Sequence, residues 1–143
     1  MGTESSATTV WEGSLTKGRG TTNAASGALP AAEVTWAARV ERTEGTTSPE
    51  ELLAAAHASC YCMALSNGLT EAGNEPQRLE ATATVTFVAG EGVRSSHLVV
   101  AGTVPGLDQA GFEAAAAEAA ENCPISAALS GNVEITVDAT LAE

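Results

Sequence analysis

Two stretches of the chain alternate apolar and polar residues at every second position. Residues 79–89 follow this pattern as far as Phe87, and residues 132–141 follow it throughout, which predicts strands with one buried face. Three further strands are predicted, from their β-branched and aromatic content and the turns that bound them, at residues 8–15, 33–40 and 93–104.

Longer apolar stretches, with helix-start signals before them, predict three helices. These cover residues 46–72, residues 108–122 and a short segment after Pro124. The glycine-rich residues 16–29 are predicted to form a loop or hairpin. Strands, a long helix, two strands, a helix and a final strand are typical of an α+β fold with mostly antiparallel sheet. Because no repeat or long linker interrupts this order, we predict a single domain over residues 1–143.

The amino-acid composition excludes several classes of function. The 143 residues are 44% hydrophobic but only 3% aromatic, and the net charge is −12. An acidic chain is a poor partner for nucleic acid or for anionic membranes. We see no secretory signal, and no apolar run reaches the roughly 18 residues of a membrane span. Three cysteines do not suit a framework of structural disulfides, so a cytoplasmic protein with reduced thiols is predicted.

The long helix begins with a strong capping signal. Ser48 is predicted to be the N-cap, Pro49 suits the first helical position, and Glu51 would complete a capping box. Glu50 lies where the positive end of the helix dipole favours an anion. Capping alone is therefore a sufficient interpretation of both carboxylates.

Helical geometry separates the two cysteines within this helix. At about 100° per residue, Cys60 shares a face with His57, whereas Cys62 points almost the opposite way. The two thiols therefore cannot bind one metal ion together. A metal site would need His57 and Cys60 to be joined by distant ligands such as Cys123 and His97, a spacing that is poor for zinc. The apolar residues around the helix predict burial on most sides.

Each cysteine can also be an unreactive core residue, because a buried cysteine usually behaves as a small hydrophobe. We assign that role to Cys62. A mid-helix Cys60 gets no help from the dipole, and burial raises a thiol pKa, so reactivity would require a nearby cation such as protonated His57 or an arginine. Cys123 precedes Pro124 and is predicted to be an N-cap, where free backbone N–H groups lower a thiol pKa. An unreactive cysteine in a helix corner is an equal alternative.

Two cysteine-bearing segments share a specific order of proline, glutamate and cysteine. They are SPEELLAAAHASCYCMALS at 48–66 and ENCPISAAL at 121–129. This combination resembles the OsmC/Ohr family of osmotically inducible and organic-hydroperoxide-resistance proteins, and AAAHASC looks more like its OsmC branch. The segments VWEGSLTKGRG, VPGLD and VEITVDATL are also similar to that family, so the resemblance covers nearly the whole chain.

The resemblance implies an intertwined homodimer with antiparallel sheets, two central helices and sites at the subunit boundary. It implies that Cys60 is the peroxidatic thiolate and Cys123 the resolving thiol. The family's arginine corresponds to Arg39, on the strand predicted before the long helix, and its partner glutamate corresponds to Glu50. Because the segment after Arg39 is slightly longer than the family pattern, Arg42 is the alternative arginine.

By the same resemblance, the protein would reduce organic hydroperoxides through a Cys60 sulfenic acid and a Cys60–Cys123 disulfide. An external dithiol, such as a lipoyl or other dithiol protein, would then reduce the disulfide. No cofactor or metal is expected. The alternative is a non-catalytic dimeric module of the same fold that binds a small apolar ligand. The four residues Cys60, Cys123, Arg39 and Glu50 favour the enzyme.

Overall fold

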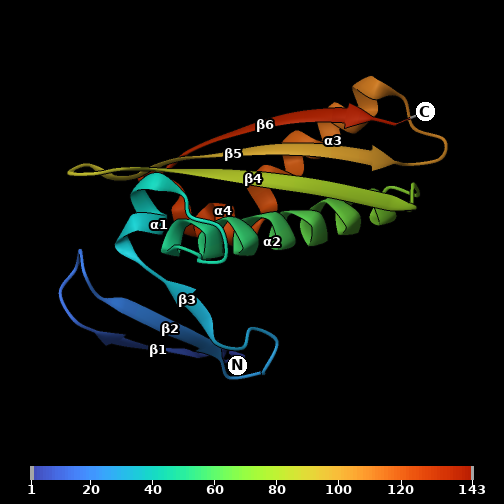
Figure 1. Ribbon diagram of the computed structural model, residues 1–143. Coiled ribbons are helices and arrows are strands. Elements are labelled where there is room, and N and C mark those ends of the chain that lie inside the picture. The colour runs from blue at the N-terminus through green and yellow to red at the C-terminus, as the bar shows by residue number, and fades with distance from the viewer. Residues whose placement is uncertain (1, 143) are drawn as a thin grey trace. The chain divides into compact units, whose positions relative to one another are not determined.

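The computed structural model describes residues 2–142 and divides into two compact units, Met1–Leu52 and Leu53–Glu143 (Figure 1). The first unit holds β1 (Ala7–Glu12), β2 (Arg19–Ala24), β3 (Ala32–Val34), α1 (Trp36–Glu41) and the start of α2 (Pro49–Glu71). The second holds the rest of α2 with β4 (Arg78–Val88), β5 (Gly92–Thr103), α3 (Gln109–Asn122), α4 (Pro124–Leu129) and β6 (Glu134–Leu141). The α+β class is confirmed, and the single-domain assignment stays a prediction.

The first unit contains an antiparallel sheet with strand order β1-β2-β3. The segment predicted as a loop or hairpin contains β2. The strand predicted at 33–40 is wrong beyond Val34, because the chain turns into α1. Thr35 caps this helix by accepting the backbone N–H of Ala38 at 3.0 Å. Arg39 therefore lies on a helix rather than on a strand.

The second unit contains a sheet with strand order β4-β5-β6. β4 and β5 are antiparallel, as predicted for consecutive strands, whereas β5 and β6 are parallel. The chain between β5 and β6 passes through α3 and α4, and a crossover of this kind returns the next strand in the same direction. The sheet of this unit is therefore mixed, while that of the first unit is antiparallel throughout.

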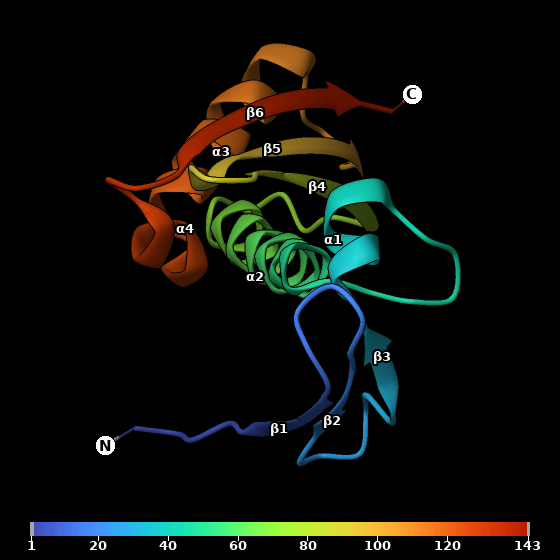
Figure 2. The ribbon, with the colours of Figure 1, turned by 60° about the vertical axis from the view of Figure 1, so that its left-hand side comes forward.

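In the second unit, α2 and α3 pack on the same face of this sheet (Figures 1 and 2). Leu98 and Val100 of β5 are fully buried there against Tyr61 of α2 and Phe112 of α3. The Phe112 ring lies so close to β5 that a Cβ added at Gly102 would come within 2.6 Å of it. Aliphatic residues at alternate positions of β4 and β6 complete the core, as their pattern predicts.

Helix α2 is buried on most sides, as its apolar sequence predicts, but one side of it is exposed. Residues spaced four apart form an exposed stripe: Ala55, Ser59, Met63 and Asn67. Met63 is 72% exposed. Among residues 2–142, no helix is both long and apolar enough to cross a membrane.

Candidate active site

Arg39 and Glu50 form a forked ion pair within the first unit. Arg39 Nε donates to both carboxylate oxygens of Glu50, at 3.0 and 3.1 Å, and Nη2 donates to Oε2 at 2.9 Å. The guanidinium also lies 5.9 Å from the centre of the Trp36 ring. Glu50 is only 6% exposed, and a buried carboxylate needs a partner of opposite charge. Arg39 supplies that charge and binds the carboxylate through two of its nitrogen atoms. This fixes the plane of the guanidinium.

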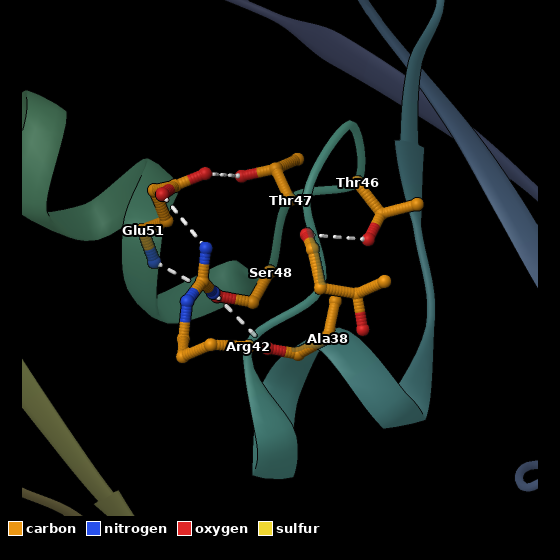
Figure 3. Close-up of polar contacts among 7 residues, drawn as sticks. Ala38, Arg42, Thr46, Thr47, Ser48 and Glu51 are labelled. Carbon is orange, nitrogen blue, oxygen red and sulfur yellow. Dashed lines mark hydrogen bonds and ion pairs between the residues drawn. The ribbon is translucent and has the colours of Figure 1, made fainter.

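Arg42, the alternative arginine, is engaged in a different set of contacts (Figure 3). Its Nη2 donates to Glu51 Oε2 at 2.9 Å, and its Nη1 donates to the Ala38 carbonyl and to Ser48 Oγ, at 3.0 and 3.3 Å. The backbone of Arg42 has a φ of +56°, a left-handed conformation that is uncommon for a non-glycine residue. Its side chain therefore joins the end of α1 to the start of α2.

The start of α2 is capped as predicted, but Glu51 serves a different purpose. Ser48 Oγ accepts the backbone N–H of Glu51 at 3.1 Å. The Glu51 carboxylate accepts from the Thr47 hydroxyl, at 2.6 Å, and from Arg42. The carboxylate of Glu51 thus fixes the loop before α2 through side chains. Glu50, which capping alone would explain, is instead the partner of Arg39.

The thiols of Cys60 and Cys123 interact in the second unit. Burial raises the pKa of Cys60; the Ile125 N–H offsets this in part, and the neighbouring Cys123 thiol raises it further. Burial also opposes ionisation of Cys123, but Ser126, Cys60 and the Ile125 N–H outweigh it and lower the pKa of Cys123. Cys123 is therefore the easier thiol to ionise in this unit. None of these influences on Cys60 is a cation.

Cys123 occupies the N-cap of α4, with Pro124 at the first helical position, as the sequence predicts. Its thiol makes no regular capping hydrogen bond. Instead, the N–H and hydroxyl of Ser126 lower its pKa from the first turn of the helix. This environment favours the reactive interpretation of Cys123 over that of an inert corner residue.

Cys62 lies on another side of α2 and is half-buried against β4. Burial raises the pKa of the Cys62 thiol, and the Ala81 backbone N–H offsets this only in part. The structure therefore separates Cys62 from the Cys60–Cys123 pair, as the helical geometry predicts, and its environment does not favour a thiolate. Within residues 2–142, no three His, Cys, Asp or Glu side chains are grouped so as to hold a metal ion.

Comparison with known proteins decides the family. The OsmC-like protein family matches residues 42–138. The chain belongs to the OsmC family. Peroxiredoxin OsmC of Escherichia coli (strain K12) is 39% identical to this OsmC-family chain over 131 residues, 90% of each protein. Organic hydroperoxide resistance protein OhrA of Bacillus subtilis (strain 168) is 31% identical over 102 residues, 70% of this chain and 72% of that one.

The fold agrees with the family. The crystal structure of organic hydroperoxide resistance protein OhrB of Bacillus subtilis matches this OsmC-family chain with a TM-score of 0.69 and 26% identity. The match covers 94% of this chain and 98% of that one. The predicted resemblance and the OsmC-like α+β fold are therefore confirmed.

Sequence reasoning missed two buried hydroxyl groups, one beside the Cys123 thiol and one beside His57. Ser126 contacts Cys123 and is 3% exposed, and Ser96 is fully buried on β5. Ser96 falls among alternating strand residues, and a serine there has no distinctive signal. Ser126 follows Cys123 by one helical turn, a spacing that could have indicated a hydroxyl facing the N-cap thiol.

Proposed function

We propose that this OsmC-family protein is a thiol-dependent peroxidase that reduces organic hydroperoxides. The observation that carries the proposal is that the thiols of Cys60 and Cys123 lie together in the second unit and influence each other's ionisation. Because burial raises the pKa of Cys60, the proposal needs a cation to stabilise the Cys60 thiolate. The family and the names of its matched relatives, a peroxiredoxin and an organic hydroperoxide resistance protein, support the peroxidase role.

In the proposed first step, the Cys60 thiolate attacks the outer oxygen of the peroxide and the O–O bond breaks. The leaving alkoxide takes up the proton that the thiol released on ionising and departs as the alcohol. We assign Arg39 to stabilise the thiolate and the charge that develops on the leaving oxygen. Glu50 would hold the Arg39 guanidinium in the orientation this needs, which the forked ion pair supports. No metal or cofactor takes part in this scheme.

In the proposed second step, Cys123 condenses with the Cys60 sulfenic acid to form a disulfide and water. An external dithiol, free or carried on a lipoyl protein, then reduces the disulfide by exchange. We further propose that the enzyme is a cytoplasmic homodimer, as the cysteine count and the family resemblance predict. The exposed stripe on α2 supports the dimer.

Thiol titration tests this proposal. One equivalent of cumene hydroperoxide should remove two of the three thiols per chain, and a dithiol should restore both. Cys60→Ser should abolish peroxide consumption, whereas Cys123→Ser should stop at a sulfenic acid that dimedone traps. Cys62→Ser is the matched control and should react like the wild type.

If the thiol count of the wild type is unchanged by peroxide, the peroxidase proposal is wrong. The non-catalytic binding module would then remain. A groove between α2 and α3, lined by small and apolar residues that include Ala64, Leu69 and Leu107, gives that alternative a candidate ligand site in the second unit.

A further inference from the structure

His57 is a fully buried titratable side chain to which the proposed reaction assigns no task. It lies on α2 with no exposed surface. Both ring nitrogens are hydrogen-bonded: Nδ1 to Ser96 Oγ of β5 at 2.7 Å, and Nε2 to Ser126 Oγ of α4 at 2.8 Å. An apolar side chain of similar size would fill this space without needing two buried hydroxyls, so the polar arrangement requires another explanation.

The hydrogen bonds of His57 lead to Ser126, which lies in the first turn of the helix that Cys123 caps. The Ser126 hydroxyl, which binds Nε2, also interacts with the Cys123 thiol, and Cys123 in turn interacts with Cys60. A chain of polar groups thus runs from Ser96 through His57 and Ser126 to Cys123. It connects three elements of the second unit, and its end is the proposed resolving thiol.

We propose that His57 is a positioning residue of the resolving step, which orients Ser126 and accepts, through it, the proton that Cys123 must lose. This inference rests on the proposed function, because it assigns a task within the disulfide-forming reaction. Nδ1–H of neutral His57 donates to Ser96 Oγ, which leaves Nε2 free to accept the Ser126 hydroxyl proton. Ser126 Oγ can then accept the thiol proton of Cys123.

The step balances in atoms and electrons. A lone pair of the Cys123 sulfur forms the S–S bond, and the S–O bond of the Cys60 sulfenic acid breaks, its electron pair leaving on oxygen. The thiol proton passes to Ser126 Oγ as the Ser126 proton passes to His57 Nε2. The leaving oxygen takes up one proton to become water, and His57 returns to its neutral form. The sum is one sulfenic acid and one thiol converted to one disulfide and one water.

The surroundings of His57 make it a transient acceptor. Burial lowers the pKa of His57, and no charged side chain among the described residues contributes to that shift. The partners of the ring from β5 and α4 are the neutral hydroxyls of Ser96 and Ser126, and Ser126 also lowers the pKa of the Cys123 thiol. A proton on the imidazole is therefore unstable and is released when the leaving oxygen can take it.

Two substitutions separate proton acceptance from packing. Ser126→Ala removes the link to Cys123 but keeps His57 on Ser96, and His57→Gln keeps an amide that can bond both hydroxyls but cannot take a proton. After one equivalent of peroxide, quenched-flow mass spectrometry follows the sulfenic acid and the disulfide. Both variants should form the sulfenic acid at the wild-type rate and the disulfide about 10- to 100-fold more slowly near pH 6.5.

The dependence of the disulfide-forming rate on pH is the decisive measurement. The rates of the two variants should approach that of the wild type toward pH 9, where a thiol ionises without help. Ser130→Ala, an exposed serine at the end of the same short helix, is the matched control and should follow the wild type. A disulfide rate in Ser126→Ala that equals the wild type, or that is reduced equally at all pH values, would overturn the inference and leave His57 a packing residue. If the wild type forms no sulfenic acid at all, the proposed function itself fails.

The tautomer of His57 gives a test that needs no variant and no turnover. Nitrogen-15 NMR of the reduced wild-type protein near pH 7.5 should show a neutral ring with the proton on Nδ1. A proton on Nε2, or a permanently charged ring, would contradict the proposed direction of transfer.

Discussion

The Arg39 guanidinium is oriented as well as neutralised by its partner. A single-point contact would balance charge, but three N–H···O contacts to Glu50 also fix the plane of the fork. Trp36 lies beside the same group. Such fixed orientation is what a group needs if it is to stabilise charge on a second atom without reorganising. It favours Arg39 over Arg42 for this task.

We therefore expect Arg39→Lys to be damaging although the charge is kept. The lysine ammonium cannot form the fork with Glu50, so sulfenic acid formation with cumene hydroperoxide should slow about 10- to 100-fold. Thiolate absorbance should also show a higher pKa for Cys60. Stopped-flow measurement of the second-order rate constant tests the first effect.

Arg42→Lys is the matched control. Arg42 is 55% exposed and paired with Glu51, so its replacement should change that rate constant by less than about threefold. If Arg42→Lys were slow and Arg39→Lys normal, the assignment of the two arginines would be reversed.

At the scale of helices and strands, local signals predicted most of the second unit and, in the first unit, the start of α2. Alternation placed β4 and β6, and Ser48 with Pro49 placed the start of α2, because these signals depend on neighbouring residues only. The helix α1 was missed because it is short and follows β-branched residues, although Thr35 caps it. Alternation does not depend on strand direction, which is why it could not show that β6 runs parallel to β5.

The sequence could predict which residues form the candidate site, but not how they are arranged in space. Family resemblance selected the arginine, glutamate and two cysteines, but helix periodicity could not join Cys60 to Cys123 across the sequence. Periodicity also could not show that burial raises the pKa of Cys60 while nearby hydrogen-bond donors lower the pKa of Cys123. The serines around His57 were missed because their role arises from three elements meeting in the folded unit.

The N-cap of α2 provides a prediction about stability. Ser48 is 2% exposed, accepts the Glu51 N–H and receives a bond from Arg42. Ser48→Ala should therefore lower the free energy of unfolding by about 1 kcal/mol, the usual cost of losing such a cap. Urea unfolding followed by circular dichroism measures the change.

Ser59→Ala, on the same helix, is the control. The Ser59 hydroxyl is exposed and donates to carbonyls of the preceding turn, those of Ala55 and Ala56. Its loss should change the unfolding free energy by no more than about 0.5 kcal/mol. Equal effects of the two substitutions would show that the cap contributes nothing specific.

For the whole molecule, the main question is what covers the exposed apolar residues. All six residues of β1 are exposed, and Val10 and Leu15 are 60% and 57% exposed. Met63, in the exposed stripe of α2, is 72% exposed. Only 3% of the residues are aromatic, so the chain has few large apolar side chains to bury. Exposing these to water forgoes the stabilisation that their burial would give. A second copy of the chain, as the family resemblance implies, would bury them.

We accordingly expect Met63→Glu to disrupt a dimer of this chain. A carboxylate in the middle of a buried apolar contact lacks a partner and costs about 2–4 kcal/mol, which raises the dissociation constant about 30- to 1000-fold. Size-exclusion chromatography with light scattering, over a range of protein concentrations, should then show monomer where the wild type is dimeric. Val99→Glu is the control, because Val99 is an exposed apolar residue, 46% accessible, on the face of β5 opposite the helices. A monomeric wild type, or a Met63→Glu protein as dimeric as Val99→Glu, would contradict a dimer built on α2.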